Sequence, residues 1–313
     1  MQYLGCPLIR DLFRKPRLIS TMIGMNGAGA DPLLICKVGG ESYAIRVDCV
    51  LELLALQKLT ITPLPGMPSH VEGMINLRGQ TLCIQNVRKM FGLTSLRDES
   101  TEIIQMLDDR EHDHIQWLKA LEAFVHDGTE FNLATDPHQC KFGKWYDQLM
   151  ADPIEMNRFA RDQLALVDTM GRFDAPHRRI HEIADKVLAL VAKGNCKEAK
   201  QVVNQAKTNE LRELKDLFAS VRQLVERFHI GVVVVVERDG VRAGLVVDSV
   251  CDVKEFQDDN YLPHSLLKDD GWVQGFVQDE ETHDLIQVIR LDMVSGFTPE
   301  RPKPQVSELV STT

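Results

Sequence analysis

The chain has 313 residues, of which 44% are apolar and 26% are charged, and its formal net charge is -10 at pH 7. This composition is typical of folded globular protein with room for two domains, and the acidic balance argues against a nucleic acid or an anionic membrane recognised through bulk charge. No stretch reaches the roughly 20 apolar residues of a membrane helix, and the N-terminus lacks a secretory signal pattern, so we expect a cytoplasmic protein whose seven cysteines stay reduced or bind metal.

Residues 33–95 have the alternating apolar pattern of β-strands and follow an N-terminal extension, residues 1–32. A Gly39-Gly40 turn between two alternating runs predicts a hairpin. A second turn is expected at Arg78-Gly79. The predicted strands of this segment are residues 34–38, 42–47, 50–54, 71–77 and 81–85.

The apolar period changes from two to about 3.6 near residue 95 and returns to two at Gly231. Residues 96–229 are therefore predicted to be helical, with enough apolar surface for a four-helix bundle. The predicted helices are residues 102–131, 140–150 with its continuation, 176–192 and 197–228. Strands are expected again at 232–236, 241–250, 273–277 and 284–291, followed by a flexible tail, residues 297–313, which lacks an apolar face.

The order of strands, helices and strands predicts one domain inserted into another. A chain that leaves a β-domain and returns to it needs close exit and re-entry points, which an exposed loop provides. Each β segment has only four or five short strands, and the two together are enough to close one barrel or a pair of barrels. We therefore predict an α+β multidomain protein, with β halves at 33–95 and 230–296 around a helical bundle at 96–229.

Four residues of the helical segment form a typical zinc ligand set. His114 lies on the apolar stripe of its predicted helix, and His177 and His181 lie one turn apart on another apolar stripe, so all three should face the bundle interior. Each of them, and Cys140, has an ordinary interpretation as a core residue. Together, however, three imidazoles and a thiol buried without polar partners would be costly. Zinc would supply the partner, and it could contribute on the order of 10 kcal/mol to folding of its domain.

The same pattern argues against a hydrolytic zinc. Such a site keeps an open position and a carboxylate base, and its helical signature is H-E-x-x-H. In this chain Arg178 follows His177, and four protein ligands leave no open position. A zinc hydrolase is a remote alternative, with Glu122, Glu130 or Glu182 as the base.

The ligands occur in the stretches H-I-Q-W at 114–117 and C-K-F-G-K-W at 140–145, and in the His177/His181 pair. Residues 113–200 thereby resemble the chemoreceptor zinc-binding (CZB) domain, a four-helix bundle with ligands in H-x-x-W, in C-x-x-G-x-W and at two His one turn apart. The resemblance implies that His114, Cys140 and the His pair bind zinc. The interval between the cysteine and the His pair is longer than the pattern predicts, which leaves the helix boundaries open there.

The flanking segments carry G-M-I-N-L-R-G at 73–79 and G-L-V-V-D-S-V at 244–250, with P-L-P-G at 63–66. These stretches resemble the CheW-like domain, the chemotaxis coupling module made of two five-stranded SH3-like β-barrels, here cut in two. The sequence departs from the pattern at Cys83, where proline is expected, and at Asn86, where aspartate is usual.

The two resemblances imply a non-enzymatic adaptor that bridges methyl-accepting chemoreceptors and the histidine kinase CheA at receptor arrays. Arg78 matches an arginine used near the partner surfaces, and Gly79 gives the turn its backbone. Cys140 bound to zinc would be a thiolate open to oxidants such as hypochlorous acid, so the helical domain would sense zinc or oxidant. The alternative is a passive scaffold with structural zinc, in which the bundle only forms a homodimer.

Overall fold

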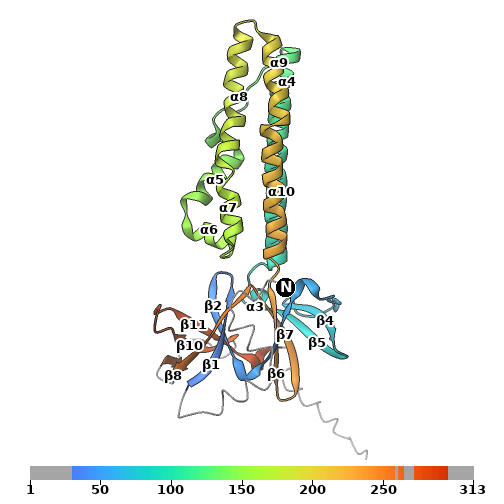
Figure 1. Cartoon of the computed structure of the whole chain (residues 1–313). Coiled ribbons are helices and arrows are strands. Elements are labelled where there is room, and N and C mark those ends of the chain that lie inside the picture. The colour runs from blue at the N-terminus through green and yellow to red at the C-terminus, as the bar shows by residue number, and fades with distance from the viewer. Residues whose placement is uncertain (1–29, 258–259, 264–270, 295–313) are drawn as a thin grey trace, which may run out of the picture. The chain divides into compact units, whose positions relative to one another are not determined.

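The computed structural model describes residues 30–257, 260–263 and 271–294 (Figure 1). Most of the expected N-terminal extension and the whole expected tail lie outside these residues. The chain divides into a β unit, formed by residues up to Ser95 and from Gly231 onward, and a helical unit, Leu96–Ile230. The architecture is thus mixed α+β. Within the described ranges, no helix has the length and apolar character required to cross a membrane.

The β unit contains two sheets, with strand orders β8-β1-β2-β11-β10-β9 and β3-β6-β7-β5-β4. Each sheet combines strands from before and after the helical unit. The parallel pairs β2–β11 and β5–β7 and the antiparallel pairs β1–β8 and β3–β6 join them. One sheet has the five strands expected, and the other has six because the short β9 pairs with β10. The elements are β1 (Ala30–Val38), β2 (Glu41–Arg46), β3 (Val50–Ala55), β4 (Val71–Leu77), β5 (Gln80–Asn86), α3 (Val87–Met90), β6 (Val232–Arg238), β7 (Val241–Val247), β8 (Ser249–Gln257), β9 (Tyr261–Pro263), β10 (Val273–Gln278) and β11 (Leu285–Ile289).

The valine run of β6 explains why neither β segment is complete alone. Val233 and Val235 belong to one apolar cluster, and Val234 and Val236 belong to another. A strand buried on both faces has a continuous apolar run instead of an alternating one. Because β6 lies between β3 and β7, its burial needs strands from both halves of the chain.

A buried ion pair links the two halves of the β unit. The Arg88 guanidinium of α3 lies 2.7 Å from the Asp248 carboxylate, and both side chains are less than a tenth exposed. Asp248 also accepts a hydrogen bond from the backbone N–H of Gly39, and Arg88 donates to the carbonyl of Thr94. The expected strand 241–250 is therefore two strands, since Asp248 interrupts it between β7 and β8.

The helical unit has more helices than the sequence pattern predicts (Figure 1). The first helix ends four residues early, before Gly128, whose φ is +71°. The segment after Cys140 forms three short helices, and the expected helix 197–228 is divided at Asn209, although the Asn209 N–H still bonds to the carbonyl of Gln205. The helices are α4 (Leu96–Asp127), α5 (Lys141–Ala151), α6 (Pro153–Ala160), α7 (Leu164–Gly171), α8 (Asp174–Ala192), α9 (Cys196–Thr208) and α10 (Glu210–Phe228).

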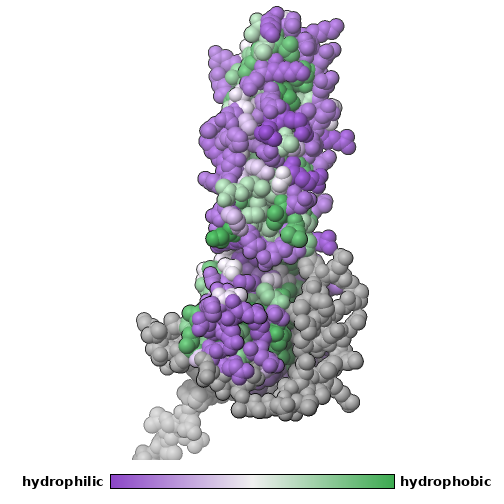
Figure 2. Space-filling model, turned by 60° about the vertical axis from the view of Figure 1, so that its left-hand side comes forward, coloured by the Kyte–Doolittle hydropathy of each residue, from purple (hydrophilic) through white to green (hydrophobic). Residues whose placement is uncertain are grey.

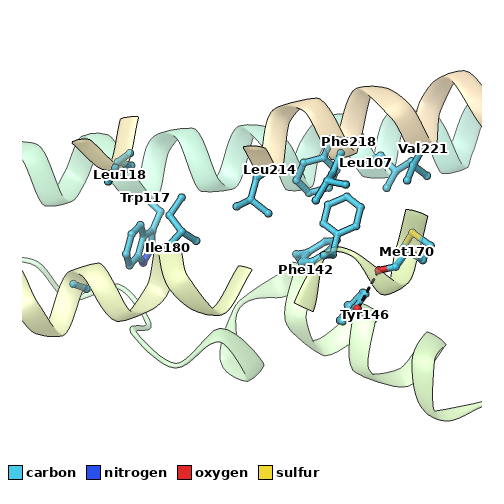
Figure 3. Packing of buried hydrophobic residues seen from close by; sticks show 14 of the residues in the cluster. Leu107, Trp117, Leu118, Phe142, Tyr146, Met170, Ile180, Leu214, Phe218 and Val221 are labelled. Atoms are coloured by element: carbon cyan, nitrogen blue, oxygen red, sulfur yellow. Dashed lines mark hydrogen bonds between the residues drawn. The ribbon is translucent and has the colours of Figure 1, made fainter. Parts of the chain in front are cut away.

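Three phenylalanines form the centre of the helical core. Phe142, Phe173 and Phe218 are almost fully buried, and their ring centroids are 4.9–5.2 Å apart. Figure 3 shows Phe142 of α5 beside Phe218 of α10, with Tyr146 reaching the carbonyl of Met170, to which its hydroxyl donates at 3.0 Å. Each aromatic pair contributes about 0.5–1.5 kcal/mol beyond its burial. The core therefore packs α5 against α10.

Candidate metal centre

Four donor side chains from three parts of the helical unit meet in its interior. His114 belongs to α4, His177 and His181 belong to α8, and Cys140 is the residue before α5. One donor atom from each lies within 4.8 Å of the other three. The spacing of one helical turn places both α8 imidazoles on the same face, where they meet the thiol and the α4 imidazole. The structure thus brings the four predicted residues together.

Hydrogen bonds orient some of these donors and leave others without a partner. The Nδ1–H of His114 donates to the carbonyl of Arg110 at 2.7 Å, which leaves Nε2 as the acceptor nitrogen. That Nε2 is buried and makes no hydrogen bond, and the same holds for both ring nitrogens of His181. The carbonyls of Ala134 and Thr135 lie near the His181 ring but without acceptable hydrogen-bond geometry. Buried polar atoms of this kind are costly, and a bound metal would satisfy them.

The cluster favours neutral imidazoles. Burial lowers the pKa of His114, and burial together with the neighbouring imidazoles lowers that of His177 to about 2 and that of His181 to about 4. Neutral imidazole is the form that binds metal. Burial raises the pKa of the Cys140 thiol, although the N–H groups of Gly143 and Phe142 oppose the shift. Without a metal the thiol is therefore protonated near pH 7.

The N-terminus of α5 is shaped around Cys140. The Gly143 N–H donates to the Cys140 sulfur at 3.1 Å, and the His177 Nε2 lies 3.2 Å from the same sulfur. A Cβ at position 143 would lie only 1.9 Å from the carbonyl oxygen of Pro137. Glycine at position 143 is thus required for the segment before Cys140 to pass this close to α5. The C-x-x-G-x-W pattern marks this position but does not give the reason for it.

Trp117 holds the connection between α4 and α5 over the cluster. Its indole N–H donates to the carbonyl of Ala134 at 2.9 Å, and its ring centroid is 4.9 Å from that of His181. The tryptophan of H-x-x-W therefore closes one side of the site. The sequence pattern shows the residue but not this contact.

The carboxylates considered for a hydrolytic site lie elsewhere. Glu122 pairs with Lys207 of α9, while Glu130 and Glu182 are exposed. Among the residues that the structure describes, the cluster contains imidazoles and a thiol but no carboxylate. None of these three carboxylates belongs to the donor cluster.

The Arg78-Gly79 turn lies in the β unit, between β4 and β5. Both residues have positive φ, 53° and 85°, as the favoured two-residue hairpin turn requires. The Gly79 N–H donates to the side chain of Asn76. Arg78 pairs with Glu52 of β3 at 2.9 Å while its side chain is 77% exposed, so its guanidinium is available at the surface.

Comparisons with known proteins match two parts of the chain to two domain families. Residues 32–113 match the CheW-like domain, and residues 114–188 match the chemoreceptor zinc-binding domain. The chain combines a CheW-like domain with a chemoreceptor zinc-binding domain. The boundary between the matches falls within α4, and β6 to β11 of the β unit lie beyond both of them.

Two known proteins, one found by sequence and one by structure, are similar to this chain. "Chemotaxis protein CheW" of Treponema pallidum (strain Nichols) is 35% identical over 68 residues, which are 22% of this chain and 39% of that protein. The chain thus spans well under half of that relative's length. The crystal structure of the scaffolding protein TtCheW from Thermoanaerobacter tengcongensis is 14% identical and covers 84% of this chain and 90% of its own. The TM-score of this match is 0.37.

Zinc is the metal of the domain family that residues 114–188 match. The donor set of the CZB segment fits that metal, because three neutral imidazoles and one sulfur are a usual tetrahedral zinc environment. The orphaned nitrogens of His114 and His181 are an independent sign that a ligand belongs there.

Proposed function

We propose that this chain is a non-enzymatic chemotaxis adaptor whose CheW-like domain couples chemoreceptors to the histidine kinase CheA at receptor arrays. Its two sheets would be the two barrels of that domain, in halves 33–95 and 230–296 around the helical insertion 96–229. Support comes from the family match and from sheets that each use strands of both halves. The exposed Arg78, held by Glu52 on the turn with Gly79, is the residue proposed for partner contact.

We further propose that His114, Cys140, His177 and His181 hold one zinc ion. The observation that carries this proposal is the convergence of four donors within 4.8 Å, two of them imidazoles with unsatisfied buried nitrogens. When bound, zinc would hold the Cys140 sulfur as a thiolate. Four protein donors without a carboxylate favour a closed site that senses or stabilises over a site that hydrolyses.

Cys140 is the donor proposed to respond to oxidant. The three imidazoles are nearly fully buried, whereas Cys140 is only partly buried, so it is the donor that a small oxidant reaches most easily. Hypochlorous acid would transfer its oxygen to the thiolate. The S–O bond forms, the O–Cl bond breaks, sulfur loses two electrons, chloride leaves, and the proton remains on the sulfenic acid. A sulfenic acid is a poorer donor, so the cluster would loosen.

The experiment is zinc content of purified protein by elemental analysis, with CheA kinase activity measured in the presence of receptor on the same samples. Wild type is compared with Cys140→Ala and His177→Ala, and Cys196→Ala, an exposed thiol of α9, serves as the control. We expect one zinc per chain, lost in the two cluster variants only, together with altered kinase activity from folded protein. Wild-type zinc near zero would refute the site.

One observation favours the second candidate, a passive scaffold with structural zinc and a dimerising helical unit. Apolar side chains of the short helices are exposed, above all Ile154 at 78% and Leu164 at 82%. Figure 2 shows the side of the helical unit that bears α5 to α7, with apolar patches among hydrophilic surface. If zinc is lost from the cluster variants without any change in kinase activity, the zinc is structural and the sensing function is excluded.

A further inference from the structure

The first turn of α4 and the end of α10 are joined within the helical unit. The Ser100 hydroxyl lies 2.6 Å from the carbonyl oxygen of Leu96 and 3.1 Å from that of His229, so its single proton is shared between the two. Through Ser95 and Gly231, these two ends continue along the chain into the β unit. Any change in the cluster that reaches the CheW-like domain through the chain must therefore pass through this pair of helix ends.

The end of α6 is fastened to the same place by two contacts. The Arg161 guanidinium lies 3.0 Å from the Glu99 carboxylate, with side chains only 15% and 25% exposed. The Nε2–H of His229, a buried residue, donates to the carbonyl of Phe159 at 3.0 Å. Arg161 has a left-handed backbone, and its N–H caps α6 by bonding to the carbonyl of Asn157. We call the pairs Arg161–Glu99 and His229–Phe159 the base latch.

A continuous arm connects Cys140 to the base latch. Helix α5 begins directly after Cys140, and the single residue Asp152 separates it from α6, whose first N–H groups it caps. The rings of Trp145 and Phe159 pack at 6.0 Å across the α5–α6 corner. With a rise of about 1.5 Å per residue, the 11-residue α5 is about 16 Å long. Packed helices move as rigid pieces, so a shift at one end of this arm is carried to the other.

We infer that α5 and α6 transmit the state of the metal cluster to the base latch, an inference that rests on the proposed zinc site. When Cys140 is held in the cluster, the arm keeps Arg161 against Glu99 and Phe159 against His229. Release of Cys140 frees the N-terminus of α5, the arm shifts, and the latch opens. The first turns of α4 and the last turn of α10 then lose contacts that fix their positions.

The test is amide hydrogen exchange of the full chain, followed by mass spectrometry, with and without a zinc chelator. In wild type we expect chelation to raise the rate of amide exchange in the first turns of α4 and the last turn of α10 by about 5- to 30-fold. This is the factor that corresponds to a loss of about 1–2 kcal/mol of local stability. Helix α9 serves as the internal reference. Arg161→Ala should show the fast exchange at the base already with zinc bound, and chelation should add little.

The matched control is Arg158→Ala. Arg158 lies on α6, close to Arg161, and pairs with Glu155, but both of these paired side chains are more than half exposed. The Arg158 variant should therefore respond to chelator like wild type. Glu99→Gln removes the other half of the latch with little change of shape and replaces Arg161→Ala if that variant does not fold.

Three results would overturn the inference. Equal protection of the base with and without zinc in wild type would show that the arm transmits nothing. A wild-type chelator response in the Arg161 variant would exclude the latch, and a rise that extends equally through α9 would indicate general unfolding. In each case one zinc per chain in wild type would leave the proposed site standing, whereas absence of zinc would refute both.

Discussion

Replacing Gly143 by alanine tests whether the shape of the α5 N-terminus determines metal binding. The new Cβ would lie 1.9 Å from the Pro137 carbonyl oxygen, whereas ordinary contact begins at 3.4 Å, so the backbone must separate by about 1.5 Å. The segment that has to move includes Cys140, whose sulfur accepts the Gly143 N–H. We expect zinc affinity to fall about 10- to 100-fold, as for other changes in groups that orient metal ligands, and the free energy of unfolding to fall by about 1–3 kcal/mol from overpacking.

Competition with a chromophoric chelator measures the affinity, and thermal unfolding of the zinc-free protein measures the steric cost separately. Gly171→Ala is the matched control, because that glycine ends α7 with nothing within 4 Å of the new Cβ. We expect its unfolding free energy to stay within about 0.5 kcal/mol of wild type. If Gly143→Ala binds zinc as tightly as Gly171→Ala, the close approach does not position Cys140 and the argument fails.

Three further predictions concern the β unit. Arg88→Met should cost about 3–5 kcal/mol in urea unfolding, because it leaves the buried carboxylate of Asp248 without its cation; an unchanged midpoint would contradict this. Arg78→Ala should leave stability within about 0.5 kcal/mol, since its ion pair is largely exposed, but it should weaken coupling of receptor to CheA; normal coupling would exclude Arg78 from the contact. Asp279 has a lowered pKa because Lys254 donates to it, so the stability it contributes is present above its ordinary value of 3.8 and is lost as pH falls through its folded pKa. Thermal melts at pH 7 and pH 3 should therefore show a difference between wild type and Asp279→Asn at pH 7 that shrinks at pH 3.

Local patterns predict those parts of the fold that neighbouring residues decide. The Gly39-Gly40 hairpin and the turn at Arg78-Gly79 follow from glycine in short connections between alternating runs, and both occur where expected. The division of the last helix at Asn209, where φ is -109° and ψ is -79°, is not predicted, because the apolar stripe continues through that residue. The interruption at Asp248 is missed for a similar reason, since its partner Arg88 is 160 residues away.

The candidate site shows the same limit. The His177/His181 pair is recognisable because one helical turn places both rings on one face, and the spacing can be read directly. The contributions of Gly143 and Trp117 cannot be read in this way, because each depends on how the connection from α4 to α5 folds back. Motif positions therefore predict which side chains supply donors, while the groups that orient those donors become visible only in the assembled structure.

The helical unit lies in the sequence between two parts of the β unit, so the positions of its two ends are constrained by the strand pairing of the β unit. Strand β6 starts at Val232 and pairs with β3. The chain must therefore return from the helical unit at a point where this pairing can form. The Ser100 hydroxyl, which shares its proton between the carbonyls of Leu96 and His229, lies between those ends inside the helical unit. A change in their spacing would have to be absorbed in the chain just before α4, in the residues after α10, or in the sheet that contains β6. Because β6 is buried on both faces, its register resists displacement. The change would therefore fall on the residues that connect the two units. Next to one of these connections, the Thr94 carbonyl accepts a hydrogen bond from Arg88. The two covalent connections are thus a route by which a change at the proposed metal site would reach strand β6.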